Sequence, residues 1–181
     1  MNTSAFADQA RQMIQDYLAA TFGLAPHSLD ILSLTPRDLP EGAAEFYVEA
    51  NDRQGREGFN CIVLSDKVYC SGPKGEFERL LREQALLEHQ DLDAVVMMRL
   101  YSLFALPRHL KYLDAKGIAR NPHDWRAYPE VTAPALESRP DGGVTLIFYA
   151  TPHLEVQPSK WMVNVTRACE VELGMFPVTP R

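Results

Sequence analysis

The chain has 181 residues, of which 46% are hydrophobic and 23% charged, so a globular protein with an ordinary core is expected. Its formal net charge of -6 argues against general nucleic-acid binding, because the phosphate backbone requires a positively charged surface. The N-terminus MNTSAFADQARQ lacks a basic segment followed by an apolar one, so the chain is predicted to be cytoplasmic, without a secretory signal.

The first half predicts a helix followed by an antiparallel meander. Apolar residues at helical spacing predict a helix over residues 4–22, and Gly23 lies where that helix should end. A short strand is expected over 29–34. The alternating stretches AEFYVEAND and EGFNCIVLSDK predict two longer strands, and VYCSG returns as a further strand after a turn at Asp66-Lys67.

The cysteines are predicted to be small packing residues. Cys61, Cys70 and Cys169 are too few and too widely spaced for a zinc ribbon or a redox CxxC pair. With a turn at Asp66-Lys67, residue 61 would face residue 72, so Cys61 and Cys70 would not lie directly opposite each other.

Two helices are predicted at the centre of the chain. GEFERLLREQALLEHQ is apolar on one face, and DAVVMMRLYSLFALP begins at a cap on Asp91 or Asp93 and ends at Pro107. The second helix has thirteen residues with one charge from Ala94 to Leu106. That is well short of the roughly 20 residues that cross a bilayer, so core burial or a partner surface is expected. Its candidate partner-binding residues are Met97, Met98, Arg99, Tyr101 and Phe104.

Arg99 leaves two alternatives open within this helix. It can lie with Ser102 on a narrow solvent-facing seam, or it can pair with an acid from elsewhere in the chain or from a partner.

A basic region follows, predicted as a short helix RHLKYLDAK that stops at Gly117 and a loop IARNPHDWRAYPE. Guanidinium and ammonium groups beside aromatic rings suit an anionic partner such as phosphate or single-stranded nucleic acid. A solvated helix face followed by an anchored loop explains the same residues. The candidate anion-binding residues are Arg108, Lys111, Arg120, Trp125 and Arg126.

The C-terminal strands resemble those of the first half at a fixed offset. Phe46 returns as Phe148, and Phe59 returns as Trp161, each displaced by 102 positions. The same offset places a second helix over residues 106–124, although its sequence does not match the first. Internal duplication is one interpretation, and coincidence between two meanders is the other. Further matching landmarks are Cys61 and Val63 with Val163 and Val165, and Gly72 with Gly174.

The predicted fold class is α+β, with two similar halves of one helix and an antiparallel meander. The first half spans residues 1–73, linking helices span 74–106, and the second half spans 107–181. This element order resembles cystatin-like domains and the small acidic chaperones of type III secretion. The resemblance concerns element order alone and transfers no functional residue.

No motif for phosphate binding, nucleophilic hydrolysis or zinc hydrolysis occurs, so no catalytic residue or cofactor is predicted. The segment LEHQDLD offers carboxylates and a histidine, but ending one helix and capping the next is its more ordinary role, so no metal is predicted.

The favoured function is a non-catalytic protein-binding module, such as an adaptor, dedicated chaperone or inhibitor-like partner, acting through the apolar helix and sheet edges. Its partner would be another protein or a second copy of the chain. One alternative is a small-molecule-binding protein or enzyme with a cavity between helix and sheet, where Tyr47, Tyr149, Glu49 or His153 would meet the ligand. Another is a nucleic-acid accessory protein using residues 108–126.

Overall fold

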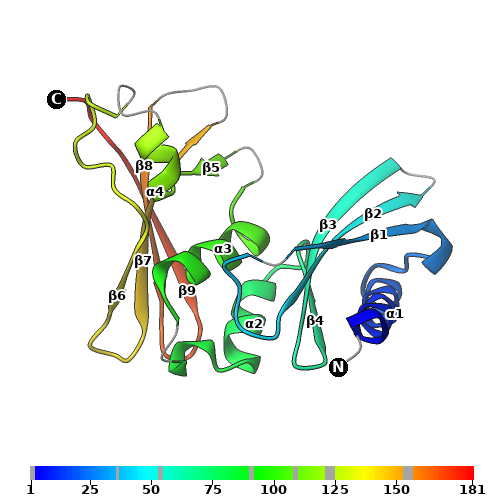
Figure 1. The fold of residues 1–181 in the computed structure, drawn as a ribbon. Helices are drawn as coiled ribbons and strands as arrows, with labels where there is room; N and C mark the ends of the chain where they lie inside the picture. The colour runs from blue at the N-terminus through cyan, green and yellow to red at the C-terminus, as the bar shows by residue number, and fades with distance from the viewer. Residues whose placement is uncertain are drawn as a thin grey trace. The chain divides into compact units, whose positions relative to one another are not determined.

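The computed structural model shows an α+β protein with two antiparallel sheets (Figure 1). The chain forms two compact units, Met1–Glu76 and Phe77–Arg181. The α+β class and the antiparallel sheets are confirmed. The residues that the structure describes are 3–35, 37–52, 55–89, 92–107, 110–120, 125–152 and 157–181.

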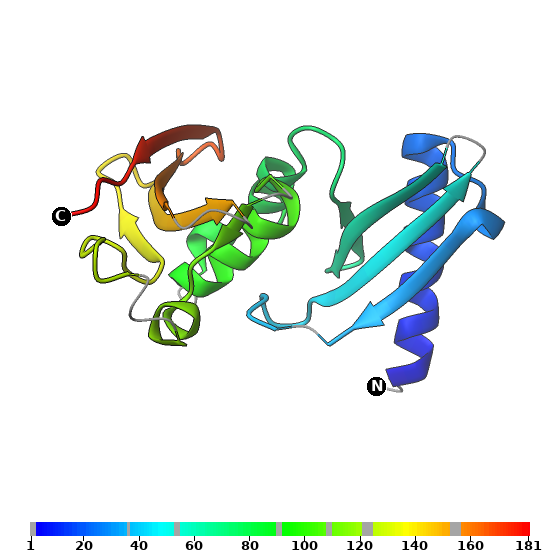
Figure 2. The same cartoon turned by 90° about the horizontal axis from the view of Figure 1, so that it is seen from above.

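The first unit is a helix lying along one face of a four-stranded antiparallel sheet of order β1-β2-β3-β4 (Figure 2). The helix ends as predicted at Gly23, whose φ is +69° and whose N–H donates to the Ala19 carbonyl at 3.0 Å. Glycine reaches this left-handed conformation without a Cβ penalty. The elements are α1 (Thr3–Phe22), the 3-10 helix η1 (Pro26–Ser28), β1 (Leu29–Leu34), β2 (Ala44–Asp52), β3 (Gly55–Leu64) and β4 (Lys67–Cys70).

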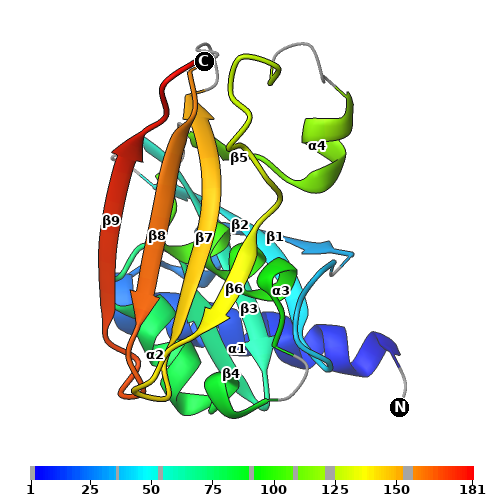
Figure 3. The ribbon, with the colours of Figure 1, turned by 90° about the vertical axis from the view of Figure 1, so that its left-hand side faces the viewer.

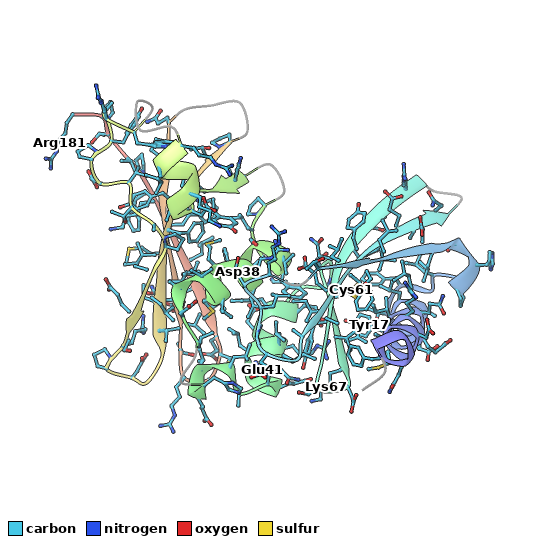
Figure 4. All side chains as sticks on the ribbon, viewed as in Figure 1. Tyr17, Asp38, Glu41, Cys61, Lys67 and Arg181 are labelled. Atoms are coloured by element: carbon cyan, nitrogen blue, oxygen red, sulfur yellow. A yellow bond between two sulfur atoms is a disulfide. The ribbon has the colours of Figure 1, made fainter. Side chains whose placement is uncertain are left out.

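The core of the first unit forms where the apolar stripe of α1 meets alternate residues of the strands. Ile14 and Leu18 are buried against Phe46 and Phe59, whose side chains lie on the same face of the sheet. Figure 4 labels two residues of this core, Tyr17 of α1 and Cys61 of β3. Helical spacing in α1 and the two-residue period in the strands together predict this core.

Cys61 and Cys70 pack in the core as predicted, but the prediction that they do not face each other is wrong, because they form a disulfide. The turn lies at Ser65 and Asp66, with φ of 50° and 59°, one residue earlier than predicted. Two positive φ angles are those of the tight turn that suits a twisted hairpin. The register therefore pairs Leu64 with Lys67 and sets Cys61 directly opposite Cys70, with 4.2 Å between their Cα atoms.

The second unit is a five-stranded antiparallel sheet whose strands follow the order β5-β7-β8-β9, with β6 also paired to β7. Figure 3 shows β6, β7, β8 and β9 side by side. The helices α2 and α3, predicted as a link between halves, belong to this unit. The elements are α2 (Glu76–Glu83), the 3-10 helix η2 (Leu86–Glu88), α3 (Ala94–Phe104), β5 (Leu110–Tyr112), α4 (Ala115–Arg120), β6 (Ala135–Ser138), β7 (Val144–Pro152), β8 (Ser159–Val165) and β9 (Val171–Pro177).

A chain of four aromatic rings connects the central helices to this sheet. Phe77 of α2 meets Tyr101 of α3 edge-on with 5.4 Å between ring centroids, and Tyr101 lies 5.8 Å from Phe148 of β7. Phe148 in turn stacks on Trp161 of β8 at 5.8 Å. Because Phe148 and Trp161 are cross-strand partners, they share the face on which α3 packs.

The opposite face of the second sheet carries a smaller cluster. Tyr149 packs there with Leu113, Val131 and Val178, and Trp125 adds a partly buried ring. The Leu113 N–H donates to the Tyr149 carbonyl at 2.8 Å. The cluster thus anchors the chain after β5 and the C-terminal residues against β7.

The predicted helix over 108–116 is wrong at residues 110–112, and the helix found at its end continues past Gly117. Residues 110–112 form strand β5, and the short helix α4 begins only at Ala115. Strand β5 pairs with residues 150–152 of β7, beyond the point where β6 pairs with that strand. Pairing with a distant strand therefore overrides the local helical pattern. The repeat offset also misplaced the covering helix, since α3 packs on the Phe148 face.

Candidate functional site

The central helix α3 places most of its predicted partner-binding residues in the interior. Met97, Met98 and Tyr101 are buried, while Arg99 and Phe104 are partly buried. Asp93 caps the helix as predicted, accepting from the N–H groups of Val95 and Val96 at 2.8 and 2.9 Å. Asp91, the other predicted cap, lies outside the described residues. A partner-binding role for α3 stays a prediction.

The predicted anion-binding residues are spread over several segments. Lys111 lies on β5 and Arg120 at the end of α4, both exposed, and Arg126 is exposed in the following loop. Trp125 packs in the small cluster of the second sheet, and its indole Nε1 is buried without a hydrogen-bond partner among the described residues. Arg108 lies outside the described residues. An anion site here stays a prediction.

The residues proposed for a cavity between helix and sheet have other neighbours. Tyr47 lies over Gly58, where an added Cβ would overlap the Tyr47 hydroxyl. Glu49 accepts from Nε of Arg56 at 3.0 Å. Tyr149 belongs to the small cluster of the second sheet, where burial, and then the charge of Glu130, raises its pKa. His153 lies outside the described residues.

Strand β9 lies at one end of the second sheet, so one row of its backbone groups has no partner among the described strands. Thr166 N–H donates to the Glu170 carbonyl and Val178 N–H donates to the Pro158 carbonyl, so even-numbered residues direct their backbone toward β8. An antiparallel strand alternates this direction at every residue. The N–H groups at residues 171, 173 and 175 therefore point to the free edge, and no described strand pairs with them.

The side chains at this edge are unusually apolar for exposed positions. Leu173, Met175 and Phe176 are 53%, 61% and 49% exposed. Leu173 and Met175 lie opposite Val163 and Trp161, so they continue the core face of the sheet out to its edge. Phe176 projects to the other face. We call residues Val171–Pro177, with these three side chains, the β9 edge.

Few of the usual devices against strand pairing occur along the β9 edge. Natural edge strands are commonly protected by charges, prolines or short length. β9 has seven residues, and it has one acid, Glu172, near its start and Pro177 at its end. Residues 173–176 between them carry no charge. The strand thus combines free backbone donors with exposed apolar side chains, which is the chemistry of strand addition.

Trp161 adds an unsatisfied donor beside this edge. Its side chain is 5% exposed, and its Nε1 is buried without a partner among the described residues. Trp161 pairs directly with Met175 in the ladder. A buried N–H without an acceptor costs about 1–3 kcal/mol, so the indole N–H of Trp161 lowers the stability of the folded unit.

Sequence reasoning predicted the strand CEVELGMFP but did not select it as a site. The sequence did contain one indication of an edge. The last strand of a meander has only one neighbouring strand in the sequence, so its other side can be left unpaired. Its apolar residues occupy both faces near Gly174, which is also unusual for an exposed strand. Long-range packing decides whether another element covers the outer edge of this strand, and the local sequence does not specify that packing.

Within the described residues, no group of three or more histidine, cysteine or acidic side chains is placed to hold a metal ion. Among the described helices, none combines the length and apolar character that a membrane crossing requires.

No family model, curated protein or solved structure matches the chain.

Proposed function

We propose that the protein is a non-catalytic protein-binding module whose β9 edge accepts an extended strand from a partner polypeptide. The observation that carries this proposal is the coincidence of outward-facing backbone N–H groups with exposed Leu173, Met175 and Phe176 on one edge strand. Backbone hydrogen bonds would supply affinity, and alternate side chains would supply specificity.

The chemistry of the edge defines the partner strand. A residue facing Leu173 or Met175 should be apolar, because it would bury area continuous with Trp161 and Val163. Near Glu172 a basic side chain is favoured. The partner is thus an antiparallel strand with apolar residues at alternate positions.

A second copy of β9 meets most of these requirements. In an antiparallel pair centred on Gly174, Leu173 of one copy faces Met175 of the other. The same register sets Glu172 opposite Phe176, so like charges do not meet. Pro177 contributes a carbonyl but no donor. The self-complementary pattern makes a synthetic peptide of residues 170–178, EVELGMFPV, a rational probe.

The peptide should bind the intact protein and shift the amide NMR signals of β9 without shifting those of β1. Replacing Met175 with lysine should weaken binding at least about tenfold, because an apolar contact worth roughly 1.5–3 kcal/mol is lost and an edge charge is gained. Val95→Lys is the matched control, since Val95 is also an exposed apolar residue, 50% exposed, but lies on α3.

The backbone contribution has its own control. N-methylation of the peptide at the residues equivalent to Leu173 and Met175 should abolish binding, whereas N-methylation at those equivalent to Glu172 and Phe176 should be tolerated. Equal binding of both methylated peptides, or no binding of the parent peptide at millimolar concentration, would contradict strand addition. Sedimentation of the protein alone then shows whether a second copy is the partner.

We further infer that the two sheets derive from duplication of one helix-and-meander unit. Strands β1 to β4 and β6 to β9 follow the same antiparallel order. Phe46 and Phe148 both point to the face on which a helix packs, and Gly42 and Gly142 both have φ of +80° before the second strand. Gly72 and Gly174 do not correspond, because Gly174 lies within β9. Relatives of this chain should keep apolar residues at the matched positions in both halves; retention in one half only would contradict duplication.

A further inference from the structure

A cavity of about 660 Å³ lies in the second unit. The end of α2, the 3-10 helix η2 and the turns at Gly142 and at Arg167–Cys169 form its walls. Its size falls within the range of small-molecule sites. The residues that line it include Leu81, Arg82, Leu87, Glu88, Arg167 and Cys169.

The cavity is locally positive in an acidic protein. It is lined by two arginines and one glutamate, whereas the whole chain has a net charge of -6. Neither Arg82 nor Arg167 forms an ion pair with a residue that the structure describes. By contrast Arg139, in the neighbouring turn, is held by Asp141, with Nη2 at 3.1 Å from Oδ2 and Nε at 3.2 Å from Oδ1.

Both arginines are exposed residues that line the cavity. Arg167 lies against Gly142, where an added Cβ would be 3.4 Å from the arginine Cδ, so its stem packs on bare backbone. Arg82 lies near Cys169 on another wall, close enough that its charge partly offsets the rise in the thiol pKa caused by burial. The Cys169 N–H donates to the Thr166 carbonyl at 2.9 Å, which holds the turn closed.

The lining also restricts what an occupant can look like. Leu81 and Leu87 offer apolar contact, while two guanidinium groups prefer carboxylate or phosphate oxygens. Glu88 repels a second negative group. The geometry points to a binding site for a small organic anion, with an apolar body and one carboxylate or phosphate head held between Arg82 and Arg167.

Hexanoate and phenyl phosphate are the probes, and hexanamide is the uncharged control. At least one anion should bind in an amide NMR titration, with shifts confined to residues 81–88, 141–143 and 166–170. Arg82→Gln and Arg167→Gln should each raise its Kd about tenfold, the loss expected for a charge-assisted hydrogen bond. The two anions differ in head group and in apolar body, and binding of either one supports the site.

Arg79→Gln provides the matched control on the same helix, because Arg79 pairs with Glu83 at 3.5 Å and does not line the cavity. It should leave the Kd unchanged. The bound anion should also slow alkylation of Cys169 by iodoacetamide in proportion to occupancy. Equal affinity for hexanamide, unchanged Kd in both arginine variants, or no binding of either anion at millimolar concentration would overturn the proposal.

Discussion

Single side chains in the second unit show how burial changes their chemistry. Tyr101 stands between Phe77 and Phe148, and burial, followed by the charge of Glu78, raises its pKa to about 12. Its ordinary value is near 10. The same helix position was selected from the sequence as a partner contact, because an apolar run does not reveal which of its faces other elements cover.

The raised pKa of Tyr101 predicts a loss of stability in alkali. As pH rises from about 10 to 12, the unfolded chain releases the phenol proton while the folded chain keeps it, so the free energy of unfolding falls over this window. Tyr101→Phe should show a smaller fall between pH 9 and 11.5 in urea unfolding. Parallel pH profiles for the two proteins would contradict the assignment.

Local residues set where α3 begins, whereas packing with other elements sets how exposed the last strand of each sheet is. Helix α3 begins where its cap requires, since Asp93 satisfies two N–H groups of the first turn. The β9 edge differs from β4, the last strand of the first sheet, because β4 has four residues and its Val68 and Cys70 pack in the core. The two similar meanders thus differ in their last strand, which is longer and more exposed in the second sheet.

Removing the Asp93 cap should destabilise α3 measurably. Asp93→Ala should lower the free energy of unfolding by about 1 kcal/mol, because the N–H groups of Val95 and Val96 lose their acceptor. Tryptophan fluorescence in urea reports the change. Asp93→Asn keeps a side-chain acceptor and should retain most of the stability; equal losses in the two variants would argue against capping.

The whole molecule consists of two units with separate chemical reporters. Both tryptophans, Trp125 and Trp161, lie in the second unit, and the Cys61–Cys70 disulfide lies in the first. Cys169 is the free cysteine among the described residues. Tryptophan fluorescence therefore reports on the second unit, whereas far-ultraviolet circular dichroism reports on both units.

Replacing both Cys61 and Cys70 with serine should destabilise the first unit by about 2–3 kcal/mol, since a short-range cross-link no longer restricts its unfolded state. Because far-ultraviolet circular dichroism sums over both units, its transition in urea should then gain a phase at lower concentration, while the tryptophan fluorescence transition stays in place. Coincident shifts of both signals would show that the two units unfold together.

The local sequence determined the periodic elements of this protein. Helical spacing and end signals located α1 and α3, and alternation located β2, β3, β7 and β8, because these patterns reflect backbone geometry within one segment. Tertiary structure decided the rest. A one-residue difference in the turn joined Cys61 to Cys70, and pairing with β7 made residues 110–112 a strand. The exposed β9 edge and the cavity beside the end of α2 likewise depend on which distant segments meet, and no local period encodes that.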